Sequence, residues 1–401
     1  MNEAYIIDGV RTPIGNFCGT LSPVRTDDLA ALVIEELMKR HPEIDPVAIE
    51  DVIMGCANQA GEDNRNVARM ALLLAGLPYT IGGETVNRLC ASGMAAVINA
   101  ASQIKLNNGD LFIAGGVEHM TRGPYVLSKA ESAYGRDQKI YDTSFGWRFI
   151  NPKMQALYGT ESMGETAENL VEKYNITREE QDEFAFQSQM KATKAQQSGR
   201  LAEEIIPVVI PQRKADPIVF DKDEFIKPHT TPEKLAALKP AFKKDGTVTA
   251  GNSSGLNDGA AAMLVASESA VKNFNLKPLA RIVSWAIAGV EPRIMGIGPV
   301  FASQKALKRS GLSLKDMDII EINEAFAAQV LACLKEMKID GNDPRINPNG
   351  GAIALGHPLG MSGTRILQTA ALELHKQNKR YALVTLCIGV GQGYATILER
   401  C

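Results

Sequence analysis

Residues Thr85–Lys105 read TVNRLCASGMAAVINAASQIK, and this stretch joins a strand signal to a helix signal. Thr85 and Val86 are β-branched, which favours a strand. After Cys90, small residues dominate Ala91–Lys105, which predicts a helix with little side-chain bulk on several faces. The stretch therefore predicts a strand that turns directly into a helix, with Cys90 at the turn.

The same alternation of strand and helix signals runs through the chain and then returns. Strands are predicted at Ala4–Asp8, Asp51–Gly55, Leu111–Gly115, Ala280–Ser284, Ile319–Ile322 and Ala382–Cys387, and helices at Asp28–Lys39, Ala91–Lys105, Ala302–Lys308 and Arg365–Lys376. This alternation predicts an α/β protein with a largely parallel sheet. Because matching elements lie about 270 residues apart, we infer a duplicated half.

Between the halves, roughly Thr121–Val248, the composition shifts to charged amphipathic helices and several prolines. Thr177 followed by Glu180 is a capping box, helical spacing of apolar residues continues from Phe184, and Gly199 suits a helix end. The segment is predicted to be an insertion. It either covers a ligand site or is a plain structural addition.

Composition indicates a globular protein with a small ligand. The chain has 401 residues, 45% of them apolar, with 43 Lys+Arg against 46 Asp+Glu. No basic block points to nucleic acid or an anionic membrane. The apolar stretches are too short to cross a bilayer, and we expect no secretory signal in the opening MNEAYIIDG. Six scattered cysteines without CxxC predict reduced thiols and a cytoplasmic location.

Cys90 is the first candidate for chemistry. At a strand-to-helix turn, free N–H groups and the helix dipole are expected to lower the pKa of a thiol and favour the reactive thiolate. The alternative is a buried cysteine that packs as a small hydrophobe.

His357 lies in a stretch too rich in glycine for an ordinary helix or strand, NPNGGAIALGHPLGMSG over Asn347–Gly363. Glycine permits close approach of backbone or ligand, and a histidine there can act as base or donor. A core histidine with satisfied hydrogen bonds is the alternative.

Two further motifs follow predicted buried strands. Cys387–Gly393, CIGVGQG, offers a second thiol beside N–H groups that glycine exposes; a dinucleotide loop is the alternative, but the full fingerprint is missing. Asn323–Phe326, NEAF, supplies an amide and a carboxylate at a strand end, or simply a helix N-cap.

Together these stretches resemble the thiolase family over essentially the whole chain. The motifs, in family order, are RTPIG at Arg11–Gly15, NRLCASG around Cys90, AGNSSGLNDGAA at Ala250–Ala261, NEAF, GGAIALGHPLGMSG and CIGVGQG. The resemblance implies two βαβαβαββ halves in a five-layered α/β/α/β/α core with an inserted loop domain. The expected division is 1–120 plus 249–272 for the first half, 121–248 for the insertion and 273–401 for the second half.

The resemblance also implies the catalytic roles. Cys90 becomes acylated, His357 activates it, and Cys387 moves the proton at the α-carbon of the acetyl unit. Asn323 holds a water that helps stabilise the enolate, and the N–H groups of Cys90 and Gly389 hold the tetrahedral oxygen. Such chemistry needs no metal and no tightly bound cofactor, and coenzyme A is a cosubstrate.

Four residues match family positions around the coenzyme A arm and the acyl pocket: Ser254, Met163, Met295 and Phe326. Apolar residues at such spacing would otherwise be read as core.

Within the family, Ala60–Pro78 and Gly146–Pro152 are most similar to 3-oxoadipyl-CoA thiolases of aromatic degradation, the β-ketoadipate pathway. The expected reaction is ping-pong cleavage of 3-oxoadipyl-CoA to succinyl-CoA and acetyl-CoA. His119, in GGVEHM, departs from that group towards fatty-acid β-oxidation thiolases, so a general 3-ketoacyl-CoA or acetoacetyl-CoA thiolase is the alternative. Arg148 or His119 could bind the distal carboxylate, or either could be structural.

Two other classes of protein are alternatives to a thiolase. A condensing synthase of the same fold would carry histidine or asparagine in place of Cys387. An inactive acyl-CoA-binding or lipid-binding protein would not require Cys90, Asn323, His357 and Cys387 together. The resemblance further implies a homo-oligomer, dimer or tetramer, with Tyr125–Lys139 in tetramer contacts.

Overall fold

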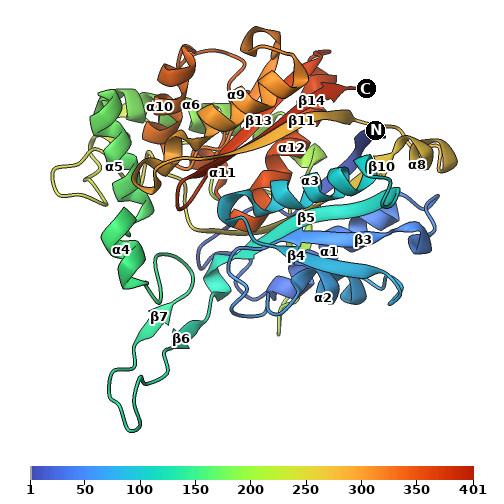
Figure 1. Ribbon diagram of the computed structural model, residues 1–401, viewed down its shortest axis with the longest axis horizontal. Coiled ribbons are helices and arrows are strands. Elements are labelled where there is room, and N and C mark those ends of the chain that lie inside the picture. The colour runs from blue at the N-terminus through green and yellow to red at the C-terminus, as the bar shows by residue number, and fades with distance from the viewer. Residues whose placement is uncertain (1) are drawn as a thin grey trace.

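The computed structural model describes residues 2–401, whose strands form one ten-stranded sheet and two small ribbons (Figure 1). The strands are β1 Ala4–Arg11, β2 Gly15–Asn16, β3 Asp51–Gly55, β4 Gly82–Val86, β5 Leu111–His119, β6 Tyr125–Leu127, β7 Ile140–Asp142, β8 Val208–Ile210, β9 Ile218–Phe220, β10 Asn257–Ser267, β11 Ala280–Gly289, β12 Ile319–Ile322, β13 Tyr381–Ile388 and β14 Gln392–Arg400. The helices are α1 Thr26–Arg40, α2 Val67–Leu74, α3 Ser92–Lys105, α4 Pro152–Tyr158, α5 Met163–Tyr174, α6 Arg178–Gln197, α7 Pro232–Ala236, α8 Glu268–Asn273, α9 Gly298–Ser310, α10 Ala327–Met337, α11 Ala352–Leu355 and α12 Leu359–Lys376.

The order of strands in the large sheet reveals two matching halves. It runs β12-β13-β14-β11-β1-β10-β5-β3-β4, and the halves meet where β1 pairs with β11. In the first half β4 leads into α3; in the second half a single parallel bridge between Ile320 and Ile346 takes the place of β4 and leads towards α12. This arrangement confirms the predicted duplication.

Three large apolar cores lie between the five layers, and the central core contacts both halves of the sheet. Helices α1 and α2 cover the outer face of β1, β3, β5 and β10. Helices α3 and α12 lie between the inner faces of the two halves of the sheet. Helices α9 and α10 cover the outer face of β11 to β14. The predicted α/β/α/β/α layering is therefore confirmed, and α3, the small-residue helix, lies in its middle.

The prediction of a largely parallel sheet was wrong. In the part of the chain that the structure describes, only three pairs in the large sheet are parallel: β3 with β4, β3 with β5, and β12 with β13. The other pairs are antiparallel. Strand β14 shows one reason: it follows β13 after a short turn, and a parallel pairing would need a crossover of a dozen residues or so.

The segment between the halves packs along the second half and also extends from the body. Helices α5 and α6 pack against α10, whereas the β6–β7 hairpin projects outward (Figure 1). The predicted capping box is present, because Thr177 and Glu180 exchange hydrogen bonds at the start of α6. Gly199, with φ +80°, follows the end of this helix as predicted. Over residues 2–401, no helix has the length and apolarity that crossing a bilayer requires.

Candidate active site

Cys90 lies on a tight turn between β4 and α3. Leu89, the residue before it, has φ +48°, a left-handed conformation that is uncommon outside glycine. The Oγ of Ser92 fixes the turn by accepting from the N–H of Arg88 (2.9 Å) and donating to the carbonyl of Leu89 (2.7 Å). Asn87 adds its Oδ1, which accepts from the N–H of Leu89 (2.9 Å). The turn therefore holds Cys90 at the N-terminal end of α3.

The small residues after Cys90 allow α3 and α12 to approach closely. A Cβ on Gly93 would collide with the carbonyl oxygen of Gly360, and a Cβ on Gly363 would collide with the backbone of Met94. Since each helix begins just after a candidate catalytic residue, this crossing brings the turns that carry Cys90 and His357 together.

The expected lowering of the Cys90 pKa does not occur. Burial raises the pKa of this thiol to about 11, although the N–H groups of Gly389 and of Cys90 itself favour the thiolate. Desolvation outweighs the helix terminus, so the resting group is a neutral thiol. The two N–H groups beside Sγ are nevertheless aimed at the place where negative charge would develop.

His357 follows Gly356, whose φ of +103° turns the chain sharply. The Oγ of Ser362 donates to the carbonyl of Pro358 (2.8 Å), so it must accept from Nδ1–H of His357, 2.6 Å away. This leaves Nε2 of His357 unprotonated and able to act as a base. Burial, and secondarily the charge of Arg365, lowers the pKa of His357 to about 3.

Asn323 meets His357 directly. Its Nδ2 lies 3.3 Å from Nε2 of His357, and its backbone N–H donates to the carbonyl of Thr385 (3.0 Å) on β13. Asn323 is buried, and its Oδ1 makes no hydrogen bond within residues 2–401. The NEAF motif thus begins with an amide in the site, and the N-cap alternative is not observed, because no side chain caps α10.

Cys387 is the last buried polar group before the turn that joins β13 to β14. Burial raises the pKa of its thiol well above the usual value. Val390 (φ +64°) and Gly391 (φ +85°) form the turn, and a β-branched residue in this region is strained. The strained turn holds the N–H of Gly389 beside Cys90.

The predicted pocket residues lie around these groups. A Cβ on Gly389 would be 3.7 Å from Sδ of Met163, at the start of α5. Met295 and Phe326 share a buried apolar cluster with Cys387. Ser254 donates its N–H to the carbonyl of Ala325 (2.9 Å), within NEAF.

The two residues predicted as candidates to bind the distal carboxylate of the substrate, His119 and Arg148, differ in their surroundings. His119 is buried, with Nε2 against the carbonyl of Leu21 (3.1 Å) and Nδ1 3.3 Å from Asp258. Both ring nitrogens of His119 therefore face protein groups, which indicates a structural role. Arg148 is partly exposed and donates to Oδ1 of Asn58 (3.3 Å); within residues 2–401 no carboxylate lies within 4.0 Å of its guanidinium.

Sequence reasoning missed Ser362 and Asn257, which hold His357, although both stand inside the quoted motifs. Asn257 accepts from the N–H of His357 through Oδ1 (3.0 Å). It also missed Glu118, whose buried carboxylate accepts from the N–H groups of Ala57, Asn58 and Gly360 and whose pKa burial raises to about 7. Motif strings alone give no hint of these partners.

One group in residues 2–401 brings three potential metal ligands together: Cys56, Asp63 and Glu118. The thiol of Cys56 donates to Asp63 (3.6 Å), and Glu118 is occupied by backbone N–H groups. Protein atoms thus already satisfy these side chains.

Comparisons with known proteins agree over the whole chain. The family described as thiolase, N-terminal domain, matches residues 4–269, and thiolase, C-terminal domain, matches residues 276–400. The chain is 58% identical to the 3-oxoadipyl-CoA/3-oxo-5,6-dehydrosuberyl-CoA thiolase of Escherichia coli K12 and 54% identical to a beta-ketoadipyl-CoA thiolase of Acinetobacter baylyi, in each case over 100% of both chains. The crystal structure of the Bacillus anthracis acetyl-CoA acetyltransferase superposes with a TM-score of 0.93 at 44% identity and covers 100% of this chain and 99% of its own. The chain therefore belongs to the thiolase family, and it is an acyltransferase of the acetyl-CoA C-acyltransferase type.

Proposed function

We propose that this thiolase cleaves 3-oxoadipyl-CoA with coenzyme A, giving succinyl-CoA and acetyl-CoA. The full-length likeness to enzymes named for that substrate supports this choice. The observation that carries the mechanism is that the crossing of α3 and α12 brings together two turns, one with the Cys90 thiol beside two N–H donors and one with an unprotonated Nε2 on His357.

In the first half-reaction, Sγ of Cys90 forms a bond to the 3-keto carbon while His357 takes the thiol proton. The N–H groups of Cys90 and Gly389 stabilise the tetrahedral oxygen. The bond between C2 and C3 then breaks, and its electron pair forms the enolate of acetyl-CoA, which the Cys387 thiol protonates at C2. Acetyl-CoA leaves, and Cys90 carries the acyl group as a thioester.

In the second half-reaction, the Cys387 thiolate takes the proton of the coenzyme A thiol, whose sulfur attacks the thioester. The departing Cys90 sulfur recovers its proton from His357, so all groups return to their starting states. Asn323 contributes an amide that points at His357 and whose Oδ1 is free to bind a water molecule. No metal or redox cofactor takes part in these steps.

Substrate selection is assigned to Arg148. A dicarboxylic acyl chain ends in a carboxylate, which an arginine binds in a bidentate manner. Among residues 2–401, Arg148 has no acidic partner within 4.0 Å, and it contacts Asn58. Ala57, the neighbouring residue, accepts from Asn87 (3.0 Å), which in turn holds the Cys90 turn.

We propose that Ser254, Met163, Met295 and Phe326 line the path of the acyl and pantetheine groups. The close approach of Met163 to Gly389 supports this. The division into 1–120 plus 249–272, 121–248 and 273–401, a cytoplasmic location and the absence of a tightly bound cofactor are also proposed. A homo-oligomer is proposed because the β6–β7 hairpin exposes Tyr125, Leu127, Tyr134 and Ile140, and light scattering of wild type and of a hairpin deletion would test it.

The reaction is tested by incubating the protein with each acyl-CoA and mapping adducts by mass spectrometry. We expect an acyl group on Cys90 and none in Cys90→Ala. A panel of 3-oxoadipyl-CoA, acetoacetyl-CoA and a medium-chain 3-oxoacyl-CoA gives the preference from kcat/KM. Equal values across the panel would favour a general thiolase, and a chain that forms no adduct would be a binding protein without activity.

A further inference from the structure

The carboxylate of Glu324 joins three segments that are far apart in the chain. Its Oε2 accepts from Oγ of Ser188 on α6 (2.6 Å) and from the N–H of Ile353 on α11 (3.2 Å). Its Oε1 accepts from Nδ2 of Asn347 (2.7 Å). Glu324 is only 1% exposed, so nearly all of its polar contacts are with protein.

Two of these contacts lead to the catalytic groups. Glu324 directly follows Asn323, and Ile353 lies four residues before His357. Asn347, for its part, makes hydrogen bonds to both the N–H and the carbonyl of Ile322, at 2.9 Å each. The Glu324 carboxylate thus connects its own loop, which carries Asn323, to the glycine-rich loop that carries His357. The side chains of Asn323 and His357 lie 3.3 Å apart.

The chain makes room for this carboxylate. A Cβ on Gly351 would collide with the carboxyl group of Glu324, so only glycine fits there. The N–H of Gly351 donates to Oγ of Ser188 (3.1 Å), which links the glycine-rich loop to α6. The packing of Glu324 therefore explains why the second glycine of NPNGG, Gly351, has no side chain.

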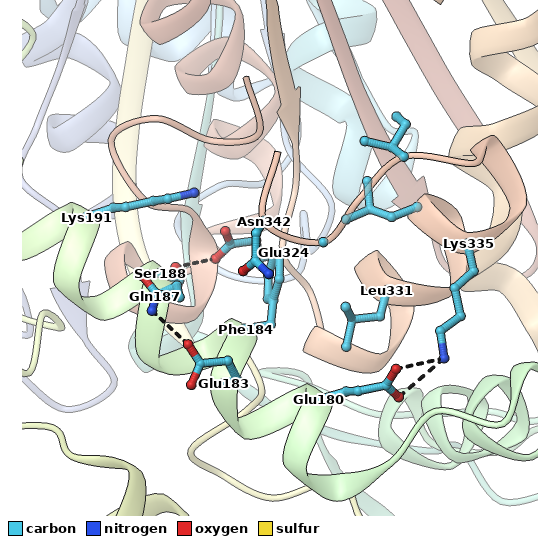
Figure 2. Close-up of a pocket in the computed structure, with 13 residues that line it drawn as sticks. Glu180, Glu183, Phe184, Gln187, Ser188, Lys191, Glu324, Leu331, Lys335 and Asn342 are labelled. Carbon is cyan, nitrogen blue, oxygen red and sulfur yellow. Dashed lines mark hydrogen bonds and ion pairs between the residues drawn. The ribbon is translucent and has the colours of Figure 1, made fainter. Parts of the chain in front are cut away.

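Glu324 and Ser188 also line a cavity of about 430 Å³ between α6 and α10 (Figure 2). Figure 2 shows the Ser188–Glu324 hydrogen bond in one part of this cavity and the ion pair of Lys335 with Glu180 in another. Glu183 lines the same cavity, but within the described residues 2–401 its carboxylate accepts only from Gln187 on its own helix. Glu183 is therefore a matched acidic control.

We propose that Glu324 is a positioning residue for the reaction: through Ser188, Asn347 and Ile353 it fixes the amide of Asn323 against the imidazole of His357. It does not touch the substrate. This inference rests on the proposed roles of Asn323 and His357. It also gives helix α6 of the insertion, through Ser188, a part in the geometry of the site.

Burial raises the pKa of Glu324, whereas the hydrogen bonds from Ser188, Asn347 and Ile353 favour its ionised form. A carboxyl group suits this task better than an amide of the same shape. Three donors converge on its two oxygens, and an ionised carboxylate only accepts. In Glu324→Gln one oxygen becomes an NH₂ group, which would face at least one of these donors. A shift of about 1 Å between reacting groups can cost about a hundredfold in rate.

The test compares Glu324→Gln, Ser188→Ala, Asn323→Ala and the double variants in the purified enzyme, by kcat, KM and thermal stability. We expect kcat to fall about tenfold or more in Glu324→Gln and about threefold in Ser188→Ala, with KM changed less than about twofold. In the Asn323→Ala background, Glu324→Gln should cost less than about twofold, because the amide it positions is already absent. Glu183→Gln should leave kcat unchanged.

Two results would overturn the inference: wild-type kcat in Glu324→Gln, or the same loss in the presence and absence of the Asn323 side chain. The second result would mean that Glu324 only supports the fold. If Glu324→Gln does not fold, Ser188→Ala in both backgrounds decides in the same way. Wild-type kcat in Asn323→Ala would instead refute the proposed role of Asn323, which separates failure of the proposed function from failure of this inference.

Discussion

Nδ2 of Asn323 lies 3.3 Å from Nε2 of His357, and both residues belong to the second half of the molecule. Cys90 comes from the first half, just before α3, and His357 lies just before the matching helix α12. The duplication thus supplies the proposed nucleophile from one half and the proposed base from the other. The crossing of α3 and α12 determines how close the turns that carry Cys90 and His357 lie to each other.

Ser362→Ala should lower kcat about tenfold with little loss of stability. The hydroxyl is the acceptor for Nδ1–H of His357, so its removal frees the imidazole to rotate and to change tautomer. Steady-state kinetics with thermal denaturation as a companion measurement would check this. Ser362→Thr retains a hydroxyl and should recover part of the rate; wild-type kcat in Ser362→Ala would show that the backbone alone orients His357.

Glu321→Gln should flatten the dependence of stability on pH. Burial raises the pKa of this carboxyl to about 8 in the folded chain, against 4.5 for the ordinary group. Between these two pH values the unfolded chain has lost the proton and the folded chain keeps it. The contribution of Glu321 to the free energy of unfolding is therefore fully present below pH 4.5 and lost above pH 8. The slope is on the order of 1 kcal/mol per pH unit.

Urea denaturation of wild type and Glu321→Gln at pH 5, 6.5 and 8.5 measures this difference. The wild type should lose unfolding free energy relative to the variant as pH rises. Because Arg365 lies nearby, the variant need not be the more stable protein at any one pH, and only the slopes are compared. Parallel curves would show that Glu321 ionises in the fold as it does in the unfolded chain.

The sequence was sufficient for local features whose causes are local. The turn at Cys90, the capping box at Thr177 and the end of α6 before Gly199 depend on residues within a few positions of one another, and the structure has them. The direction of β14 and the pairing of β1 with β11 depend on tertiary arrangement, and strand signals do not contain it. Alternation alone therefore predicted too many parallel strands.

The prediction of a lowered pKa for Cys90 was wrong for a related reason. A helix N-terminus is visible in sequence and lowers the pKa of a thiol, but burial is a property of the whole fold and raises it more. Ser362 and Glu324 were likewise inside recognised motifs, yet what each holds is set by contacts with His357 and with Ser188. Residue types were predictable, and their partners were not.

Val390→Gly should keep or raise stability while lowering activity. Val390 has φ +64°, which costs a residue with a Cβ about 1–2 kcal/mol, and glycine removes this strain for about 0.5–1 kcal/mol of added unfolded-state entropy. A looser turn should place the N–H of Gly389 less well, and kcat should fall about tenfold.

Val219→Gly is the matched control for Val390→Gly. Val219 is an exposed strand residue of β9 without a left-handed backbone, so this change should cost about 0.5–1 kcal/mol and leave kcat unchanged. Urea denaturation and kinetics on both variants separate strain from general loosening. A Val390→Gly protein with lower stability and full activity would contradict a strained, functional turn.

Arg148→Gln should change substrate preference and leave the chemistry intact. If the guanidinium binds the distal carboxylate, kcat/KM for 3-oxoadipyl-CoA should fall about 10- to 100-fold, the range of a charged hydrogen bond of about 1.5–3 kcal/mol. Acetoacetyl-CoA has no distal carboxylate, so its kcat/KM should stay within about twofold. Arg148→Lys keeps the positive charge but loses the two parallel N–H groups of the guanidinium. Its kcat/KM for 3-oxoadipyl-CoA should lie between those of the wild type and Arg148→Gln. Arg213→Gln removes the same charge from an exposed loop and should change neither substrate. Equal losses for the two substrates would assign Arg148 to the support of Asn58 and the Cys90 turn, and no loss for either would leave the distal carboxylate to another group.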